Sequence, residues 1–305
     1  MSAEQTYQWL QVCLQPADTP HALLTNNVYP YIRTVLETGM ADSFSFSRRP
    51  GSRGLIQLYF KGQTDVLQHM LAPNTTHFFQ RVLARRAVIC APYYPEPQRY
   101  GGATGHFLSM LQYRSSSETV LEQLYRNGAY WNASRALETA RRLHLDLLFR
   151  ARMEPAAGAV FFTQLNEHFQ HGYGTQLGNG ARYAANAERL LEADRYWWQL
   201  LRTDPPTDES WRRWDSMQQI ISNSLQRALA QGKLCERPPT ELLRVQRRGN
   251  HDQAQLWSFY ADFVRLTNNR LGLSVEDEGY LYYSMAKSLH ALSLETNQTH
   301  LATAV

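Results

Sequence analysis

The first ninety residues alternate apolar strand-like runs with amphipathic helices, and this order restricts the fold more than any other feature of the chain. The runs with strand composition and alternating polarity are residues 7–14, 43–47, 55–61 and 88–91. Two helical segments separate them, residues 20–37 and 65–86, and the second is predicted to break near Pro73-Asn74. Residues 50–54 are predicted to form the turn between the two middle strands. The order β-α-β-β-α-β predicts a ferredoxin-like half with an antiparallel sheet.

After Gly102 the character of the sequence changes, and the chain becomes mostly helical. The predicted helices are residues 105–113, 117–126, 133–149, 184–201, 209–230, 253–269 and 276–291. Breaks are predicted at residues 154–158, 172–180, 203–207 and 237–239. We therefore expect the α+β class, with the ferredoxin-like βαββαβ half packed against a mostly helical C-terminal half. We expect one domain over residues 1–305, divided into a sheet part (1–102) and a helical part (103–305).

Composition excludes several broad classes of protein. With 43% hydrophobic residues in 305, the chain can bury a substantial core. It shows no signal-peptide pattern and no run of about eighteen apolar residues, so we expect a cytoplasmic protein without a membrane partner. Three separated cysteines suggest neither a disulfide framework nor a zinc site. The net charge of +4 is small and the arginine clusters are short, so nucleic acid is an unlikely partner.

The turn at residues 94–102 (YPEPQRYGG) is the most distinctive short segment. Its two prolines fix φ near about −65° and favour extended residues before them. Its two glycines allow a sharp turn or a close approach to a ligand. Glu96 and Arg99 are thereby held on a stiff scaffold. An ordinary surface turn with a solvated ion pair explains the composition equally well.

Several other groups suggest chemistry but have simpler explanations. His168 and His171, three residues apart, lack a third metal ligand, and solvated histidines at a loop edge explain them better. The glycine-rich segment 172–180 lacks the ending of a phosphate loop and is better explained as a flexible loop. Ser115–Ser117 are expected to cap the helix at 117–126.

Residues near the C-terminus also have two interpretations. Tyr280, Tyr282 and Tyr283 share one predicted helix, where core packing is the default, although a phenol lining a pocket can donate a proton. Arg265 and Arg270 flank Asn268-Asn269 near a helix end, where the macrodipole favours cations. This explanation is adequate for one of the two arginines and less so for both.

Taken in order, these segments resemble a known family: the C-terminal domain of class I lanthipeptide (lantibiotic) dehydratases and the stand-alone thiopeptide biosynthesis enzymes built from it. The segments that carry the resemblance are YQWLQVCL, LIQLYFKG, PEPQRYGG, SSSETVL and NNRLGL. PEPQRYGG is the most specific of these. The resemblance covers much of the chain and implies an enzyme that modifies a precursor peptide.

In the dehydratases, the resemblance implies elimination of glutamate from glutamylated Ser or Thr residues. The family strand usually reads like HLRLRF, and its arginines help to bind the glutamyl group. Here the corresponding positions are Leu55, Gln57 and Tyr59, and the family histidine falls at Arg265. Glutamate elimination needs a guanidinium for the leaving carboxylate and a base for the α-proton, so these losses argue against it.

Stand-alone relatives that differ in this way resemble pyridine synthases of thiopeptide biosynthesis. They are implied to join two dehydroalanines of an azole-bearing peptide in a formal four-plus-two cycloaddition. Loss of water and of the leader peptide then forms a pyridine macrocycle. The resemblance calls for no cofactor and no metal, and its partner is the precursor peptide, both leader and core. A homodimer is considered possible.

On this basis we predict which residues line the site. The predicted catalytic residues are Glu96, Arg99, Tyr59, Arg265 and Tyr283. The predicted substrate-binding residues are Gln57, Tyr94, Tyr100, Ser116, Ser117, Asn269 and Arg270.

Two alternatives stay open. One is a glutamate-eliminating lyase of a split lantibiotic-type dehydratase, in which other cations such as Arg48 or Arg265 replace the lost arginines. The other is a non-catalytic peptide-binding subunit that uses an exposed sheet edge.

Overall fold

The structure of the protein is a computed structural model that describes residues 7–16, 19–49, 54–83, 88–173, 179–203, 208–235 and 251–303. The predicted turn at 50–54 and the predicted breaks at 172–180, 203–207 and 237–239 lie wholly or largely outside these residues. The chain forms two compact units. The first comprises residues 1–96, 113–131 and 269–272, and the second comprises residues 97–112, 132–268 and 273–305. The predicted single domain divided at residue 102 stays a prediction.

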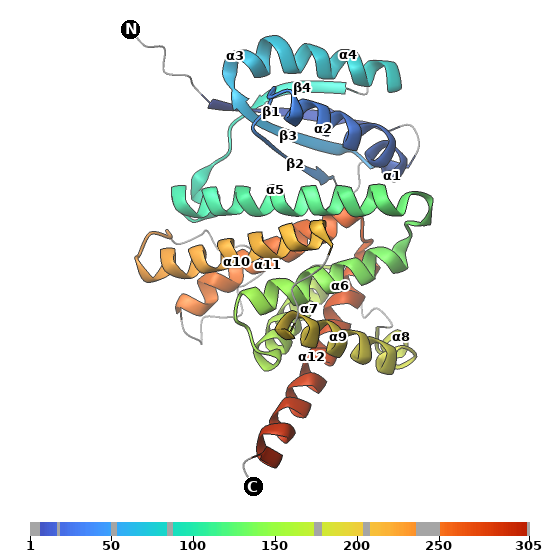
Figure 1. Ribbon diagram of the computed structural model, residues 1–305, viewed down its shortest axis with the longest axis vertical. Helices are drawn as coiled ribbons and strands as arrows, with labels where there is room; N and C mark the ends of the chain where they lie inside the picture. The colour runs from blue at the N-terminus through green and yellow to red at the C-terminus, as the bar shows by residue number, and fades with distance from the viewer. Residues whose placement is uncertain are drawn as a thin grey trace. The chain divides into compact units, whose positions relative to one another are not determined.

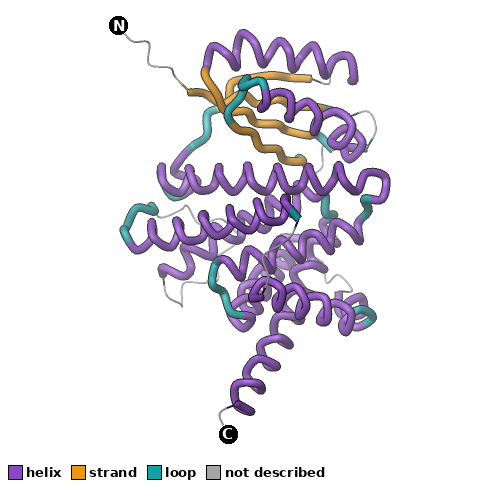
Figure 2. The backbone as a smooth tube through the Cα atoms, in the orientation of Figure 1, coloured by secondary structure: helices purple, strands orange, loops and turns teal. Residues whose placement is uncertain are grey.

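The first unit is built on a four-stranded antiparallel sheet (Figure 2). Its strands are β1 (Tyr7–Leu14), β2 (Ser43–Arg48), β3 (Ile56–Gln63) and β4 (Val88–Tyr93). Their order in the sheet is β2-β3-β1-β4, which is the ferredoxin-like arrangement. The α+β class and the four strands predicted from alternation are confirmed, with strand ends shifted by at most two residues.

The two faces of the sheet differ sharply in burial. Along β3 the burial alternates, so that Leu58 and Phe60 are fully buried while Gln57 and Tyr59 between them are half-buried. Helices α2 (Tyr29–Glu37) and α4 (Ala72–Val82) contact each other through Tyr31, whose hydroxyl is 2.7 Å from Thr75 Oγ1. Because the other face is fully buried, the half-buried face of the sheet is the one available to a substrate.

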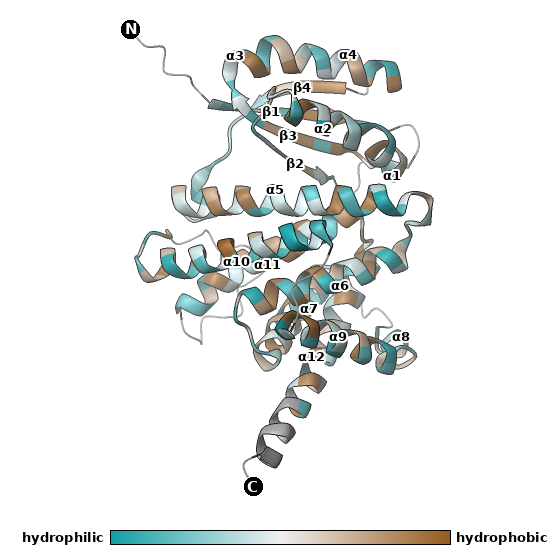
Figure 3. Cartoon of the chain, in the orientation of Figure 1, coloured by the Kyte–Doolittle hydropathy of each residue, from teal (hydrophilic) through white to brown (hydrophobic). Residues whose placement is uncertain are grey.

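Both helical segments of this unit contain a π-helical turn directly before a proline-bearing turn. The first runs over α1 (Pro20–Leu23) and a π turn at Leu24–Val28 into α2. The second runs over α3 (Thr64–Val66) and a π turn at Leu67–Leu71 into α4 (Figure 1). Helix α4 carries both hydrophilic and hydrophobic residues along its length (Figure 3). The predicted break near Pro73-Asn74 was wrong, because a widened turn accommodates the missing N–H of Pro73 without ending the helix.

Helix α5 (Gly102–Asn127) replaces the two helices predicted at 105–113 and 117–126. The expected cap at Ser115–Ser117 was wrong, since Ser116 and Ser117 lie in the middle of α5 and are fully buried. Ser117 Oγ accepts a hydrogen bond of 3.0 Å from the N–H of Phe46 in β2. The serines therefore satisfy buried partners, and a helix need not end where its hydroxyls are used in this way.

The second unit is helical. Its helices include α6 (Ala133–Arg150), α7 (Pro155–Tyr173), α8 (Asn179–Ala184), α9 (Ala187–Thr203), α10 (Glu209–Ala230), α11 (His251–Leu271) and α12 (Val275–Thr303). Most were predicted, and the helix predicted at 184–201 corresponds to α9, whereas α8 was not predicted. Helix α7 was missed, because Pro155 and Gly158 suggested a break. Pro155 instead occupies the first helical position, where it needs no N–H partner.

The alternating burial of β3 gives a direct test of which side chains lie on the buried face of the sheet. We expect Leu58→Ala to lower the free energy of unfolding by about 2–5 kcal/mol, because it opens a cavity in the core. Gln57→Ala, one residue away on the other face, should cost less than about 1 kcal/mol. Urea unfolding monitored by circular dichroism measures both. Equal losses in the two variants would contradict the assignment of the faces.

Candidate functional site

The half-buried face of the sheet carries the predicted residues Gln57 and Tyr59. Tyr59 accepts a hydrogen bond of 3.1 Å from Gln11 Nε2, and its ring centroid lies 4.9 Å from that of Tyr93. Burial raises the pKa of the Tyr59 phenol, with the hydrogen bond from Gln11 opposing. The phenol is therefore neutral at neutral pH, and this part of the face offers hydrogen-bonding groups without charge.

The outer edge of β2 is closed by Asn269, at the end of α11. Its side-chain amide makes two hydrogen bonds to the main chain of Arg48: Oδ1 accepts from the N–H at 2.7 Å, and Nδ2 donates to the carbonyl at 2.5 Å. This pairing imitates a neighbouring strand, and it satisfies edge groups that would otherwise stay open.

Arg270 continues the same edge. Its Nε donates to the carbonyl of Phe46 at 2.7 Å, and its Nη1 donates to Ser116 Oγ at 2.8 Å. The guanidinium also lies 5.3 Å from the ring centroid of Tyr113. Burial lowers the pKa of Arg270 to about 10. The group therefore stays cationic at neutral pH while it is bound to neutral acceptors.

Arg48 forms the second buried cation of this edge. Its Nε donates to the carbonyl of Arg270 at 3.0 Å, and burial lowers its pKa to about 10. Its Nη2 is buried without a hydrogen-bond partner. Gly272, at φ 79°, leaves room for this group, because a Cβ there would lie 2.6 Å from Arg48 Nη1. Across the described ranges, no recorded ion pair joins a carboxylate to Arg48 or Arg270.

The predicted turn after β4 lies at the surface. Tyr94 is 71% exposed, and Glu96 and Arg99 are exposed as well. Arg99 and Tyr100 belong to a 3₁₀ turn at Pro97–Tyr100, and the Tyr100 ring centroid lies 5.3 Å from that of His106. The predicted roles of these residues, and those of Ser116, Ser117, Asn269 and Arg270 in binding substrate, stay predictions.

A polar network in the helical unit was not predicted. Glu278 and Tyr282, one turn apart on α12, are joined by a short hydrogen bond from the Tyr282 hydroxyl to Glu278 Oε1. Asn268 Nδ2 donates to the same carboxylate oxygen at 3.2 Å and to the Tyr282 oxygen at 3.3 Å. Burial raises the pKa of Glu278, while the hydrogen bonds and the charge of Arg265 oppose this. A carboxyl group of this kind can exchange protons closer to neutral pH than an exposed one.

His144 is joined to this network through Asn268. Its Nε2 lies 2.7 Å from Asn268 Oδ1, and burial lowers the pKa of His144 to about 4. The ring is therefore neutral at neutral pH, and it donates from Nε2 because the amide oxygen can only accept. This contact fixes the orientation of the Asn268 amide and aims its N–H group at Glu278 and Tyr282.

Of the predicted catalytic residues in this unit, Arg265 lies close enough to Glu278 for its charge to affect the pKa of that group. The predicted Tyr283 points elsewhere, with its ring centroid 5.9 Å from that of Tyr183. The role predicted for Tyr283 stays a prediction, and its neighbour Tyr282 is the tyrosine that contacts Glu278. The spacing of Glu278 and Tyr282 by four residues in a predicted helix was a signal that could have identified the pair.

No group of three or more histidine, cysteine or acidic side chains in the described ranges could hold a metal ion. His168 and His171 lie in the last turns of α7, where His171 Nδ1 is 2.7 Å from the carbonyl of Glu167. None of the described helices combines the length and apolar composition needed to cross a membrane.

The burial of neutral His144 predicts a loss of stability in acid. The unfolded chain binds a proton on this histidine below about pH 6.5, whereas the folded chain does so only near pH 4. The contribution of neutral His144 to the free energy of unfolding is therefore fully present above pH 6.5. It is lost as the pH falls from 6.5 to 4, by up to about 3 kcal/mol.

His144→Gln keeps a donor for Asn268 but does not titrate, so its unfolding free energy should change less between pH 7 and pH 4.5. His290→Gln, at an exposed position, is the matched control and should behave like the wild type. Urea unfolding at each pH measures the difference. An unchanged pH dependence in His144→Gln would refute the assignment.

Comparisons with known proteins agree with this architecture. Residues 9–289 match the family described as lantibiotic biosynthesis dehydratase C-term. Among solved structures, TsrL is 19% identical with a TM-score of 0.69, and the match covers 93% of this chain and 94% of TsrL. The pyridine synthase TbtD from thiomuracin biosynthesis is 14% identical with a TM-score of 0.68, covering 92% of this chain and 97% of TbtD.

The tRNA-dependent lantibiotic dehydratase MibB from Microbispora sp. 107891 is 17% identical with a TM-score of 0.65. The match covers 97% of this chain but only 29% of MibB. The comparison with curated protein sequences returns no match. The family match extends over nearly the whole sequence, and the chain therefore belongs to the lantibiotic dehydratase C-terminal family.

Proposed function

We propose that the protein is a pyridine synthase of thiopeptide biosynthesis. In this reaction two dehydroalanines of one precursor peptide combine in a formal four-plus-two cycloaddition. One of them reacts as the azadiene of a tautomerised amide, and the other reacts as the alkene. Loss of water and of the leader peptide as an amide then gives the aromatic pyridine. Membership of a peptide-modifying family supports the class of substrate.

The neutral side chains at positions 57 and 59 of β3 are the observation that carries the proposal. Gln57 and Tyr59 occupy the β3 positions where the resemblance implies arginines, and they face the same side as Gln11. An uncharged surface with a phenol and carboxamides suits an azole-bearing peptide better than a glutamyl carboxylate. Glutamate elimination would need a cation at these positions.

Much of the rate can come from holding the two alkene arms close together. Correct positioning of two reacting groups is worth at most about 7–11 kcal/mol. The amide hydrogen bonds of Gln57 and Gln11 and the rings of Tyr59 and Tyr93 are suited to this work. Positioning leaves only proton transfers for the protein to assist.

The helical unit contains a pair with the chemistry for proton transfer, Glu278 and Tyr282. Tautomerising an amide and expelling a hydroxyl each need a group that accepts a proton and returns it. Glu278, with its raised pKa and its hydrogen bond from Tyr282, is such a group. Arg265 favours the ionised carboxylate, which is the form that accepts a proton. Glu96, Arg99 and Tyr283 remain proposed members of the site.

The activity itself is tested with two peptides. The purified protein is incubated with a linear azole peptide that carries a leader and two dehydroalanines, and separately with a peptide that carries glutamylated serine. We expect mass spectrometry to show a pyridine macrocycle and a released leader fragment from the first peptide only. Release of glutamate from the second would overturn the proposal.

The role of Glu278 has a matched control two residues away. We expect Glu278→Gln to lower kcat by about 10²–10⁴-fold, because the amide cannot accept a proton. Glu276→Gln changes an exposed carboxylate in the same first turn of α12 and should leave kcat unchanged. Wild-type kcat should fall as the pH drops below the raised pKa of Glu278. Equal kcat values for the two variants would exclude this role.

Arg48 and Arg270 favour a second candidate, a divergent glutamate lyase. They are two buried guanidiniums, and Arg48 Nη2 lacks a hydrogen-bond partner. Such groups could bind a leaving carboxylate in place of the arginines missing from β3. The two-peptide assay separates the candidates. A protein that binds leader peptide but converts neither substrate would instead be a non-catalytic subunit.

A further inference from the structure

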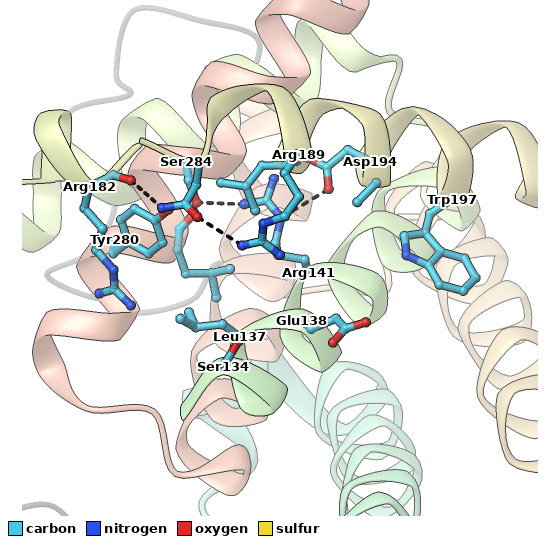
Figure 4. Close-up of a pocket in the computed structure, with 14 residues that line it drawn as sticks. Ser134, Leu137, Glu138, Arg141, Arg182, Arg189, Asp194, Trp197, Tyr280 and Ser284 are labelled. Atoms are coloured by element: carbon cyan, nitrogen blue, oxygen red, sulfur yellow. Dashed lines mark hydrogen bonds and ion pairs between the residues drawn. The ribbon is translucent and has the colours of Figure 1, made fainter. Parts of the chain in front are cut away.

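A second feature of the helical unit is a pocket of about 280 Å³ lined by α6, α9 and α12, together with Arg182 of α8 (Figure 4). In Figure 4, Arg182 and Tyr280 lie at one end, Trp197 lies at the other, and Arg141 lies between them. None of the predicted site residues lines this pocket, and neither do Glu278 and Tyr282.

The floor of the pocket is electrically balanced. Arg141 and Asp194, with side chains only 8% and 1% exposed, form a two-pronged ion pair. Arg141 also donates to Ser284 Oγ at 2.7 Å and to Ser288 Oγ at 3.1 Å. The two charges of this pair cancel, and most N–H groups of Arg141 donate to groups within the protein. The floor is therefore a rigid base that does not itself select an ion.

The rim carries the cations that can act on a ligand. Asn186 connects them: its Nδ2 donates to the carbonyl of Arg182 at 2.9 Å, and its Oδ1 accepts from Arg189 Nη2 at 3.3 Å. Arg182 is held by Asp277 at 3.0 Å and lies 3.9 Å from the ring centroid of Tyr280. Arg189 is exposed, and its recorded partner in the described structure is this neutral amide. Its positive charge is therefore available at the mouth of the pocket.

The walls combine apolar and polar side chains, including the carboxylate of Glu138, which pairs with Arg135 at 3.3 Å. Leu137, Leu190 and Leu281 line the pocket together with the indole of Trp197. The guanidinium of Arg142 lies 4.1 Å from the centroid of this indole and stiffens it. A ligand for such walls has an apolar group, and a ligand for the rim has a negative charge close to it.

The lining is also longer than a single side chain. On α9 it extends from Arg189 to Trp197, about 12 Å at 1.5 Å per residue. On α6 it extends from Ser134 to Arg141, about 10 Å. An extended peptide of about three residues spans this length.

We propose that this pocket binds a peptide segment in which an apolar side chain is followed by an acidic one. The apolar side chain lies against Trp197 and Leu190, and the carboxylate lies on Arg189. This inference rests on the proposed function only in taking a peptide as the partner.

Binding is tested on the full-length protein labelled with 5-fluorotryptophan, in which the Trp197 fluorine signal is assigned with Trp197→Phe. The probes are acetyl-Ala-Leu-Glu-Ala-amide, the same peptide with Gln in place of Glu, and acetyl-leucine. We expect the acidic peptide to move the Trp197 signal and to bind about fivefold more tightly than its Gln counterpart, which is on the order of 1 kcal/mol.

Arg189→Gln should abolish this preference for Glu. Arg195 is an exposed cation on the same helix as Arg189, lies outside the pocket and pairs with Glu295 of α12. Arg195→Gln should therefore retain the preference for Glu. No movement of the Trp197 signal, equal binding of the two peptides, or the same loss in both variants would overturn the proposal. Acetyl-leucine binding as tightly as the acidic peptide would identify a site for small carboxylates and would also overturn it.

The readout does not depend on turnover. A protein that binds the acidic peptide without forming pyridine would refute the proposed function and support this pocket. A protein that forms pyridine while Trp197 stays silent would do the reverse.

Discussion

The hydrogen bonds from Asn269 and Arg270 to the main chain of β2 are the interaction on which the first unit depends. A strand at the edge of a sheet exposes donors and acceptors that invite pairing with another chain. Here the end of α11 supplies side chains in place of a fifth strand. Their hydrogen bonds to the main chain of Arg48 and Phe46 are 2.5–2.7 Å long. Arg270 also donates to Ser116 Oγ at 2.8 Å. Residues more than two hundred positions apart are joined in this way, so the sheet cannot be complete without the C-terminal part of the chain.

This closure has an electrostatic consequence. Using arginine to bind main-chain carbonyls places positive charge where burial lowers its pKa, and Arg48 adds a second guanidinium beside it. Arg270 is close enough to Tyr59 that ionisation of this phenol would raise the pKa of the guanidinium. The neutral groups Gln57 and Tyr59 on β3 therefore have cations near them that are already used in holding the fold. Whether a substrate carboxylate could compete for them is what separates the two candidate functions.

Local patterns were sufficient to predict the sheet, because alternation along β1 and β3 directly reflects which side chains are buried. They failed where a residue's partner is distant in sequence. Ser117 looks like a helix cap, but its partner is Phe46, seventy-one residues away. Pro73 and Pro155 look like breaks, but a π-helical turn and a first-turn position accommodate them. The NNR segment belongs to the resemblance, but nothing in its sequence indicates that Asn269 binds the main chain of Arg48.

The three consecutive residues Asn268, Asn269 and Arg270 do different work because successive side chains on a helix point about 100° apart. Asn268 orients toward Glu278 and Tyr282 under the control of a neutral His144, whereas the next two residues complete β2. Asn is suited to the first position, because its amide accepts from the imidazole and donates to the carboxylate at once. An aspartate there would lose the donor and set a second negative charge beside Glu278. The chemistry proposed for Glu278 thus requires an amide at residue 268 as much as it requires the carboxylate itself.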